Sequence, residues 1–241
     1  MAQSRPGGPR GSQLRVLPAS YGGTEYGNLS ANLELIARSG GLEPDCKVLE
    51  IGSGKGRLLH EFRARGLDVV GVELNPRLIA AGRQAFGRMP IVRGTAVQLC
   101  LRDASFDVVL EFDVFEHIAD TERHVDEVWR VLRPGGRYLL TTPNKWTNIA
   151  FEVIIQRSFT RWKAYHCALH SRNELRRRLT RHGFEVTFHD VPLVNEWFLR
   201  KVRAFFGRAG VAVVRILSPD RGPAALRTNF CVEARKAVPS R

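Results

Sequence analysis

A glycine-rich turn between an apolar run and a helical pattern is the feature that most constrains this chain. Val48 to Ile51 is apolar apart from Glu50, as is typical of a buried parallel strand. Three glycines follow at alternate positions from 52 to 56, and apolar residues resume at helical spacing after Arg57. Strand, glycine turn and helix are the first half of a nucleotide-binding βαβ unit. We therefore predict an α/β fold whose bare glycine backbone lies against a ligand.

The spacing of the glycines restricts the ligand. A dinucleotide fingerprint, G-x-G-x-x-G, would need a small residue where this chain has Arg57, and the third glycine here is Gly56. This spacing argues against a nicotinamide dehydrogenase. A second apolar run, Asp68 to Glu73, ends in an acid 17 residues after Gly56, where a neighbouring parallel strand would return. A carboxylate there can accept hydrogen bonds from both ribose hydroxyls, so Glu73 is a candidate ribose ligand.

The rest of the chain continues the alternation of strands and helices. Ser171 and Glu174 form a capping box at the start of a helix, and Asn75-Pro76 supplies a cap and a first-turn proline for another. Helical periodicity also covers 28–39 and 120–132. Further strands are predicted at 91–93, 105–111, 137–142, 184–191 and 228–235. We expect the last of these strands to be antiparallel and to form the edge of the sheet.

Several motifs together resemble class I S-adenosylmethionine-dependent methyltransferases. They are the glycine turn after Glu50, the run S-F-D-V-V at 105–109, the pair Glu116-His117 before a helix, and L-R-P-G-G at 132–136. Thr-Pro-Asn at 142–144 resembles the small-molecule branch that includes ubiquinone-biosynthesis O-methyltransferases. The resemblance covers about 28–144, 171–191 and 228–236. It implies a Rossmann-like, doubly wound sheet of seven strands, mostly parallel with an antiparallel last strand, and S-adenosylmethionine as the cofactor.

The resemblance also implies where the cofactor binds. The family segment G-D-A-x-x-L carries an aspartate that accepts a hydrogen bond from the adenine amino group, whereas this chain has Thr95 at that position. Either the threonine hydroxyl replaces the aspartate, or the backbone near Ala96 and Val97 alone holds the ring. The candidate cofactor ligands are Glu50, Gly52, Ser53, Gly54, Gly56, Glu73, Leu74, Thr95, Ala96, Val97, Glu111 and Phe112.

Methyl transfer from a sulfonium is a direct displacement, so the protein mainly aligns the reacting atoms, and an oxygen nucleophile gains from a base. His117, with Glu116 beside it, is the predicted base, because the site lies beyond the carboxyl ends of the strands. Alternatively this pair only shapes the loop. His166 and His170 would share a helix face, but no further ligand is spaced to join them, so we expect no metal. A Mg²⁺ site of oxygen ligands within 111–117 is the weaker alternative.

Charge and composition separate the possible acceptors. The chain has 37 basic and 24 acidic residues, a net charge of +13, which favours a nucleic-acid methyltransferase as the alternative. However, it lacks the N/D-P-P-Y/F motif of amino methyltransferases and a Pro-Cys nucleophile, so nucleic acid is not the expected partner. A non-catalytic cofactor-binding scaffold is the other alternative, against which the intact Glu50, glycines and Glu73 argue. We predict transfer to a small-molecule acceptor, through an oxygen nucleophile of a phenolic, lipid-like or sugar compound.

Domain organisation follows from the remaining segments. Residues 1–23, rich in proline and glycine with three arginines and no acid, indicate a disordered basic tail. Residues 24–241 are expected to form one methyltransferase domain with inserts at about 149–169 and 195–217. Dispersed cysteines (Cys46, Cys100, Cys167, Cys231) and the lack of an 18-residue apolar run indicate a cytoplasmic protein. Oligomeric state is left open.

The second insert has two interpretations. Phe198, Leu199, Val202, Phe205 and Phe206 are predicted to occupy one helical arc, opposite an arc of basic side chains. The aromatic arc either covers the acceptor pocket or a neighbouring subunit, which we favour for the fold, or lies on an anionic membrane surface. In the second case the protein would be peripheral at the inner membrane surface.

Overall fold

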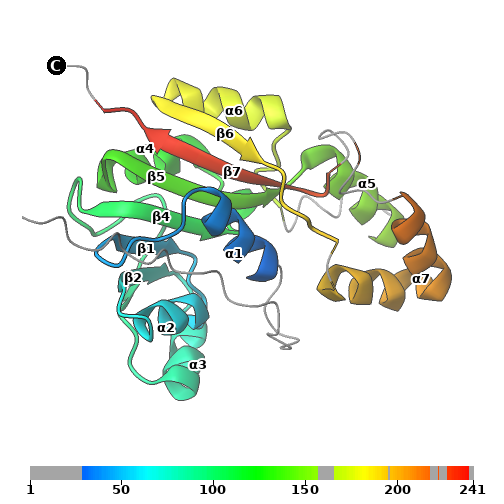
Figure 1. Ribbon diagram of the computed structural model, residues 1–241, viewed down its shortest axis with the longest axis horizontal. Coiled ribbons are helices and arrows are strands. Elements are labelled where there is room, and N and C mark those ends of the chain that lie inside the picture. Colours follow the sequence, from blue (N-terminus) through cyan, green and yellow to red (C-terminus); the bar gives the residue numbers. More distant parts are fainter. Residues whose placement is uncertain (1–28, 157–165, 195, 218–221, 223–226, 239–241) are drawn as a thin grey trace, which may run out of the picture.

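The computed structural model describes residues 29–156, 166–194, 196–217, 222 and 227–238 (Figure 1). The predicted tail at 1–23 lies outside these residues. The strands are β1 (Lys47–Ile51), β2 (Asp68–Glu73), β3 (Ile91–Arg93), β4 (Phe106–Phe112), β5 (Leu132–Pro143), β6 (Phe184–His189) and β7 (Asn229–Lys236). The helices are α1 (Leu29–Arg38), α2 (Arg57–Arg63), α3 (Pro76–Phe86), α4 (Thr121–Val131), α5 (Lys145–Gln156), α6 (Arg172–Arg181) and α7 (Glu196–Leu217), with a 3₁₀ turn, η1 (Phe115–His117).

The strands form one seven-stranded sheet in the order β3-β2-β1-β4-β5-β7-β6. β1 pairs in parallel with both β2 and β4, and the chain winds outward in both directions from it. β7 runs antiparallel to both β5 and β6. The predicted doubly wound sheet, mostly parallel with an antiparallel last strand, is therefore confirmed.

The prediction that the last strand forms the edge of the sheet is wrong. β7 lies between β5 and β6, and β6 is the edge strand. The side chains of Phe230, Cys231 and Val232 are buried on alternating faces of β7, and a strand covered on both faces reads as a continuous apolar run. That run was the signal for a central strand.

The sheet divides the core into two layers, because successive side chains of a strand point to opposite faces. Leu49 of β1 packs in a cluster with Val125 of α4 and Leu175 of α6. Val48, one residue earlier, packs on the other face with Leu35 of α1 and with α2. Figure 1 shows the ribbons of α4 and α6 separated from those of α1 and α2 by the sheet.

Local signals in the sequence set most element boundaries. Asn75 caps α3 by accepting a hydrogen bond from the Arg77 N–H (3.0 Å), and the capping box of Ser171 and Glu174 at α6 is present as predicted. The strand predicted at 137–142 begins earlier in the structure, since β5 starts at Leu132 and includes the segment 133–136. The pairing register of β4 and β5 shifts there, which accommodates the glycine turn inside the strand.

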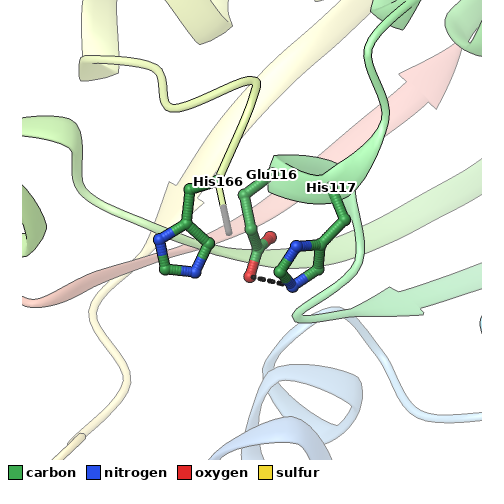
Figure 2. Close-up of side chains that lie close together, drawn as sticks. All are labelled: Glu116, His117 and His166. Carbon is green, nitrogen blue, oxygen red and sulfur yellow. Dashed lines mark ion pairs between the residues drawn. The ribbon is translucent and has the colours of Figure 1, made fainter. Parts of the chain in front are cut away.

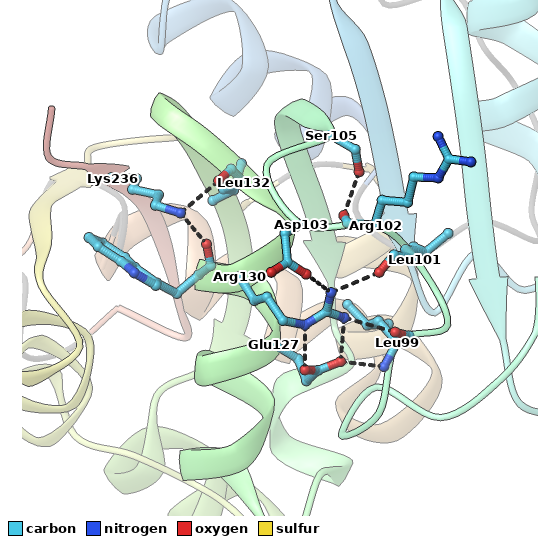
Figure 3. Close-up of polar contacts among 10 residues, drawn as sticks. Leu99, Leu101, Arg102, Asp103, Ser105, Glu127, Arg130, Leu132 and Lys236 are labelled. Carbon is cyan, nitrogen blue, oxygen red and sulfur yellow. Dashed lines mark hydrogen bonds and ion pairs between the residues drawn. The ribbon is translucent and has the colours of Figure 1, made fainter.

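Arg130 fixes the loop that precedes β4 (Figure 3). Its guanidinium donates to the carbonyls of Leu99 and Leu101, each at 2.8 Å, and to the carboxylate of Glu127. Glu127 in turn accepts the Leu99 N–H at 2.6 Å. Nearby, Lys236 Nζ donates to two carbonyls at the end of α4, at 2.6 and 2.7 Å, which ties β7 to that helix. The hydrogen bonds from Arg130 and Lys236 satisfy main-chain carbonyl groups that have no partner within the loop or at the end of the helix.

The two predicted inserts contribute α5 and α7, which lie side by side at one end of the molecule (Figure 1). α7 bends at Gly207, whose φ of +63° and ψ of −160° interrupt the helix. The predicted apolar arc at 198–206 lies before this bend, and its side chains differ in burial. Leu199 and Val202 are buried against Val211 from beyond the bend. Phe205 and Phe206 stay 56% and 43% exposed.

Candidate functional site

The glycine turn after β1 is built so that one of its glycines faces open space. All three glycines have positive φ: +71° at Gly52, +56° at Gly54 and +77° at Gly56. A Cβ at Gly52 would lie 2.3 Å from a Val114 methyl carbon, and one at Gly56 would lie 2.9 Å from Ile91. A Cβ at Gly54 would have no neighbour within 4 Å. Gly52 and Gly56 are thus required by packing, whereas Gly54 leaves room for a ligand.

Glu73 holds this turn from the end of the neighbouring strand. Its Oε2 accepts the Gly54 N–H at 2.8 Å, and its Oε1 accepts the Asn75 N–H at 2.7 Å. Each carboxylate oxygen keeps a further lone pair that can accept a hydroxyl proton. Leu74 beside it is 65% exposed, the kind of apolar surface that a bound ring would cover. The structure therefore brings Gly54, Glu73 and Leu74 together, as the sequence predicted.

Glu50 is buried beneath the turn as an acid with an incomplete set of partners. Burial, and then the nearby charge of Glu73, raise the pKa of Glu50 to about 8. Its Oε2 has no hydrogen-bond partner among the described residues. A buried, unpartnered carboxyl oxygen suits a cationic ligand group such as an amine or a sulfonium.

The loop at 95–97 is positioned by a buried network that the sequence did not predict. His124 of α4 contacts the Ala96 carbonyl through Nδ1 at 3.0 Å and Glu111 Oε2 through Nε2 at 2.7 Å. Tyr138 donates its hydroxyl proton to the same carboxylate oxygen at 2.7 Å. Because both ring nitrogens face acceptors, the imidazole carries both protons. Burial lowers the pKa of His124, but the charge of Glu111 and the hydrogen bonds to Glu111 and Ala96 together outweigh it, so the pKa is raised.

Two of the expected cofactor ligands, Glu111 and Thr95, have side chains that are engaged in contacts within the protein. The Glu111 side chain is fully buried in this network, so its carboxylate points into the core rather than to the ends of the strands. The Thr95 hydroxyl accepts the Val97 N–H at 3.4 Å, a local turn contact. His124 and Tyr138 could have been found: His124 shares the buried face of α4 with Val128 and Val131, where an ionisable side chain needs a partner.

A second group of side chains lies beyond β4 (Figure 2). Glu116 is 2% exposed and accepts a hydrogen bond from the Thr142 hydroxyl at 3.2 Å, while the His117 side chain is half exposed. His117 Nε2 lies 3.9 Å from Glu116 Oε1. Burial, and then the charge of Asp113, raise the pKa of Glu116 to about 8. The predicted base and its acidic neighbour thus lie together, next to Val114 under the glycine turn.

His166 joins this group, and His170 does not. The imidazole centroids of His166 and His117 are 5.2 Å apart. His170 Nδ1 instead contacts the Ala168 carbonyl at 2.7 Å, and its ring packs edge-on against Phe115. Glu116 and His117 lie beside His166 because of the fold, a neighbourhood that the spacing of ligands along the sequence does not indicate.

Comparisons with known proteins identify similar sequences and structures. Residues 49–140 match a family described as "Methyltransferase domain". A probable S-adenosylmethionine-dependent methyltransferase of Mycolicibacterium smegmatis is 40% identical over 100 residues, which cover 42% of this chain and 39% of the relative. The chain thus matches about two fifths of the length of such curated relatives.

Solved structures share the fold at low identity. An S-adenosylmethionine-dependent methyltransferase of Mesorhizobium loti has a TM-score of 0.61 at 20% identity, with 86% of this chain and 98% of that chain covered. The [4+2]-cyclase SpnF has a TM-score of 0.62 at 20% identity, with 91% of this chain and 86% of that chain covered. The fold is therefore shared with a protein named for a different reaction, and the choice of reaction depends on the site.

Proposed function

Since residues 49–140 match the methyltransferase-domain family, we propose that the whole chain transfers a methyl group from S-adenosylmethionine to a small-molecule acceptor with an oxygen nucleophile. The observation that carries this proposal is the open space at Gly54, bordered by the carboxylate of Glu73. The acceptor would be a phenolic, lipid-like or sugar compound.

The residues around the turn fit such a cofactor. The Gly54 backbone would lie against it, Glu73 would accept the ribose hydroxyls, and Leu74 would cover one side. The unpartnered Glu50 carboxyl would face its positive charge. Thr95, or the backbone after it, would hold the adenine. When bound, the cofactor supplies a methyl group that is already activated as a sulfonium, so these residues need only orient it.

His117 is the proposed base for the acceptor hydroxyl. It is half exposed beyond β4, and Glu116 lies beside it within the carboxyl-end region where ligands bind in open α/β sheets. In the alternative, the two residues only hold η1 in place. The hydrogen bond from the Ala168 N–H to the Glu116 carbonyl (3.0 Å) fits either role.

Exposed apolar side chains on two neighbouring helices form a patch that supports a lipid-like acceptor. The patch consists of large exposed side chains on α5 and α7, and the rings of Phe151 and Phe205 meet across it at 6.4 Å. Exposed Arg200, Arg203 and Arg208 belong to α7 as well. Apolar and basic side chains on one helix are the pattern of peripheral binding to an anionic membrane. The patch residues are Trp146, Phe151, Ile154, Phe205, Phe206, Val213 and Ile216.

Two alternatives are separated by direct measurements. A nucleic-acid methyltransferase would use the charge of +13 to bind nucleic acid with a strong salt dependence. A non-catalytic scaffold would bind the cofactor without turnover. Titration with S-adenosylmethionine and with a nicotinamide cofactor, followed by a screen of phenolic, lipid and sugar acceptors with labelled cofactor, distinguishes these functions. Within the described part of the chain, no helix combines the length and apolar character needed to cross a bilayer.

Replacement of Glu73 by alanine is expected to weaken cofactor binding about ten- to a hundredfold. Loss of a charge-assisted contact costs roughly 1.5–3 kcal/mol, and 1.4 kcal/mol is a factor of ten. Calorimetric titration with S-adenosylhomocysteine and with its 2′-deoxy analogue measures the affinity for each ligand. The wild-type protein should prefer the ribose form, and Glu73→Ala should bind both alike. If folded Glu73→Ala keeps the preference for the ribose form, another residue must contact the ribose hydroxyls.

Sedimentation with vesicles tests the membrane contact. At low ionic strength the protein should pellet with anionic vesicles and not with neutral ones, since each basic residue near anionic lipid contributes about 1 kcal/mol. The double variant Arg203→Gln/Arg208→Gln should lose most of this binding. Arg83→Gln/Arg102→Gln, which removes the same charge from exposed sites outside α7, is the control. The membrane contact is contradicted if the protein is absent from the pellets of both kinds of vesicle. It is also contradicted if both double variants lose vesicle binding to the same degree.

A further inference from the structure

Two imidazoles and one carboxylate converge beyond β4. The ligand atoms of Glu116, His117 and His166 all lie within 4.8 Å of one another. Across the ranges that the structure describes, no other group of three His, Cys, Asp or Glu side chains meets in this way. Figure 2 shows the Glu116 carboxylate between the two rings, with His166 reaching it from the segment that leads to α6.

The His166 side chain has hydrogen-bonding capacity that the described residues do not use. His166 Nδ1 is buried and has no hydrogen-bond partner among the described residues. The ring of His166 lies beside that of His117, tilted by 35°. Glu116 and His117 are 3.9 Å apart, too far for a hydrogen bond between them. A shared cation would use all three ligands at once.

The surrounding structure orients these ligands. The Thr142 hydroxyl donates to Glu116 Oε2, which leaves Oε1 directed toward His117. The Ala168 N–H and the Cys167 thiol donate to the Glu116 carbonyl, at 3.0 and 3.6 Å, and so anchor the segment that carries His166 beside η1. Partners that fix ligands from behind are a regular part of protein metal sites.

We propose that Glu116, His117 and His166 bind a divalent transition-metal cation of the Zn²⁺ type. Imidazole nitrogen is a ligand for zinc and its neighbours, whereas Mg²⁺ and Ca²⁺ take oxygen. Zinc ligands sit about 2.0–2.2 Å from the metal, so side-chain rotations that shorten the spacing to roughly 3–4 Å complete the site. Three protein ligands leave a fourth position open, as in catalytic zinc sites.

The open position lies where the acceptor is expected, and this part of the inference rests on the proposed function. The metal would lower the pKa of an acceptor hydroxyl bound there, as it lowers the pKa of zinc-bound water. The hydroxyl would then release its proton to water at a lower pH. His117 would then be a metal ligand and not the base. This reverses the sequence-based expectation of no metal, which relied on the spacing of histidines along the chain.

Calorimetric titration of the chelator-treated full chain with Zn²⁺ alone tests the site, without cofactor or acceptor. We expect one Zn²⁺ per chain, and at least tenfold weaker binding in both His166→Ala and Glu116→Gln. His60→Ala, which removes an exposed histidine on α2, should bind as the wild type. Circular dichroism confirms that each variant is folded. Co²⁺ in place of Zn²⁺ should give visible absorption that His166→Ala loses.

The outcomes distinguish this site from the proposed function. Unchanged Zn²⁺ affinity in folded His166→Ala, or no binding by the wild type, overturns the site. Zinc binding with methyl transfer that is equal with and without metal overturns the acceptor role. Failure of every acceptor screen, with Zn²⁺ binding still dependent on His166, removes the proposed function and leaves the metal site in place.

Discussion

Replacement of Gly54 by valine should abolish S-adenosylmethionine binding, at least a hundredfold, while the protein stays folded. A valine side chain would project into the one part of the turn where a Cβ has no neighbour within 4 Å, the space proposed for the cofactor. Valine at a φ of +56° also costs roughly 1–2 kcal/mol of backbone strain. Calorimetric titration gives the affinity, and circular dichroism reports the fold.

Gly66 provides the control for that strain. Its φ is +82°, a Cβ there also has no neighbour within 4 Å, and it lies between α2 and β2, at the amino end of the strand. Gly66→Val should therefore lose stability to a similar degree and keep cofactor affinity. If both variants lost affinity equally, strain and not space would explain the effect at Gly54. Wild-type affinity in folded Gly54→Val would place the cofactor elsewhere.

Replacement of Glu111 by alanine should destabilise the protein by about 3–5 kcal/mol, because it leaves the charge of His124 buried without its partner. Both side chains are 0% exposed, so water cannot replace the lost contact. Denaturant unfolding at pH 6 measures the loss. The pKa of His124 is raised, so the pair stabilises the fold fully below the ordinary value of 6.5 and progressively less as the pH rises through the folded-state pKa.

Two further variants show whether burial explains this loss. Glu111→Gln keeps a hydrogen-bond acceptor without the charge and should lose less stability than alanine. Glu34→Ala removes an exposed carboxylate paired with Arg38 at 2.8 Å, and surface pairs of this kind contribute about 0.3–0.5 kcal/mol. A change under 1 kcal/mol in Glu111→Ala would mean that the network is not a buried ion pair.

Local chemistry made most of the fold predictable. Asn75 and Ser171 cap their helices through contacts within three residues, and the bounds of β2 were predicted without error. Sheet order is different, because it depends on which distant strands pair. The apolar run at Phe230 indicates a strand covered on both faces, but it does not say which strands β7 pairs with, and the edge was misplaced.

The residues of the site were likewise predictable where the signal is local in the sequence. The backbone pattern at 52–56 and the strand end at Glu73 are local features, and both lie where expected. The direction of the Glu111 side chain depended on His124 and Tyr138 from other elements. His166 reaches Glu116 from beyond α5, so no spacing rule along the sequence could place them together.

The central place of β7 has a consequence for how the protein is made. Strands β3, β2, β1, β4 and β5 can pair as soon as residues up to Pro143 have left the ribosome. β6 cannot add to them, because β7 lies between it and β5 and comes last of the strands in the chain. Until Asn229–Lys236 are synthesised, β5 has an open edge that can pair with another unfinished chain. Translation to the end of β7 is therefore the step that completes the sheet and covers the edge of β5.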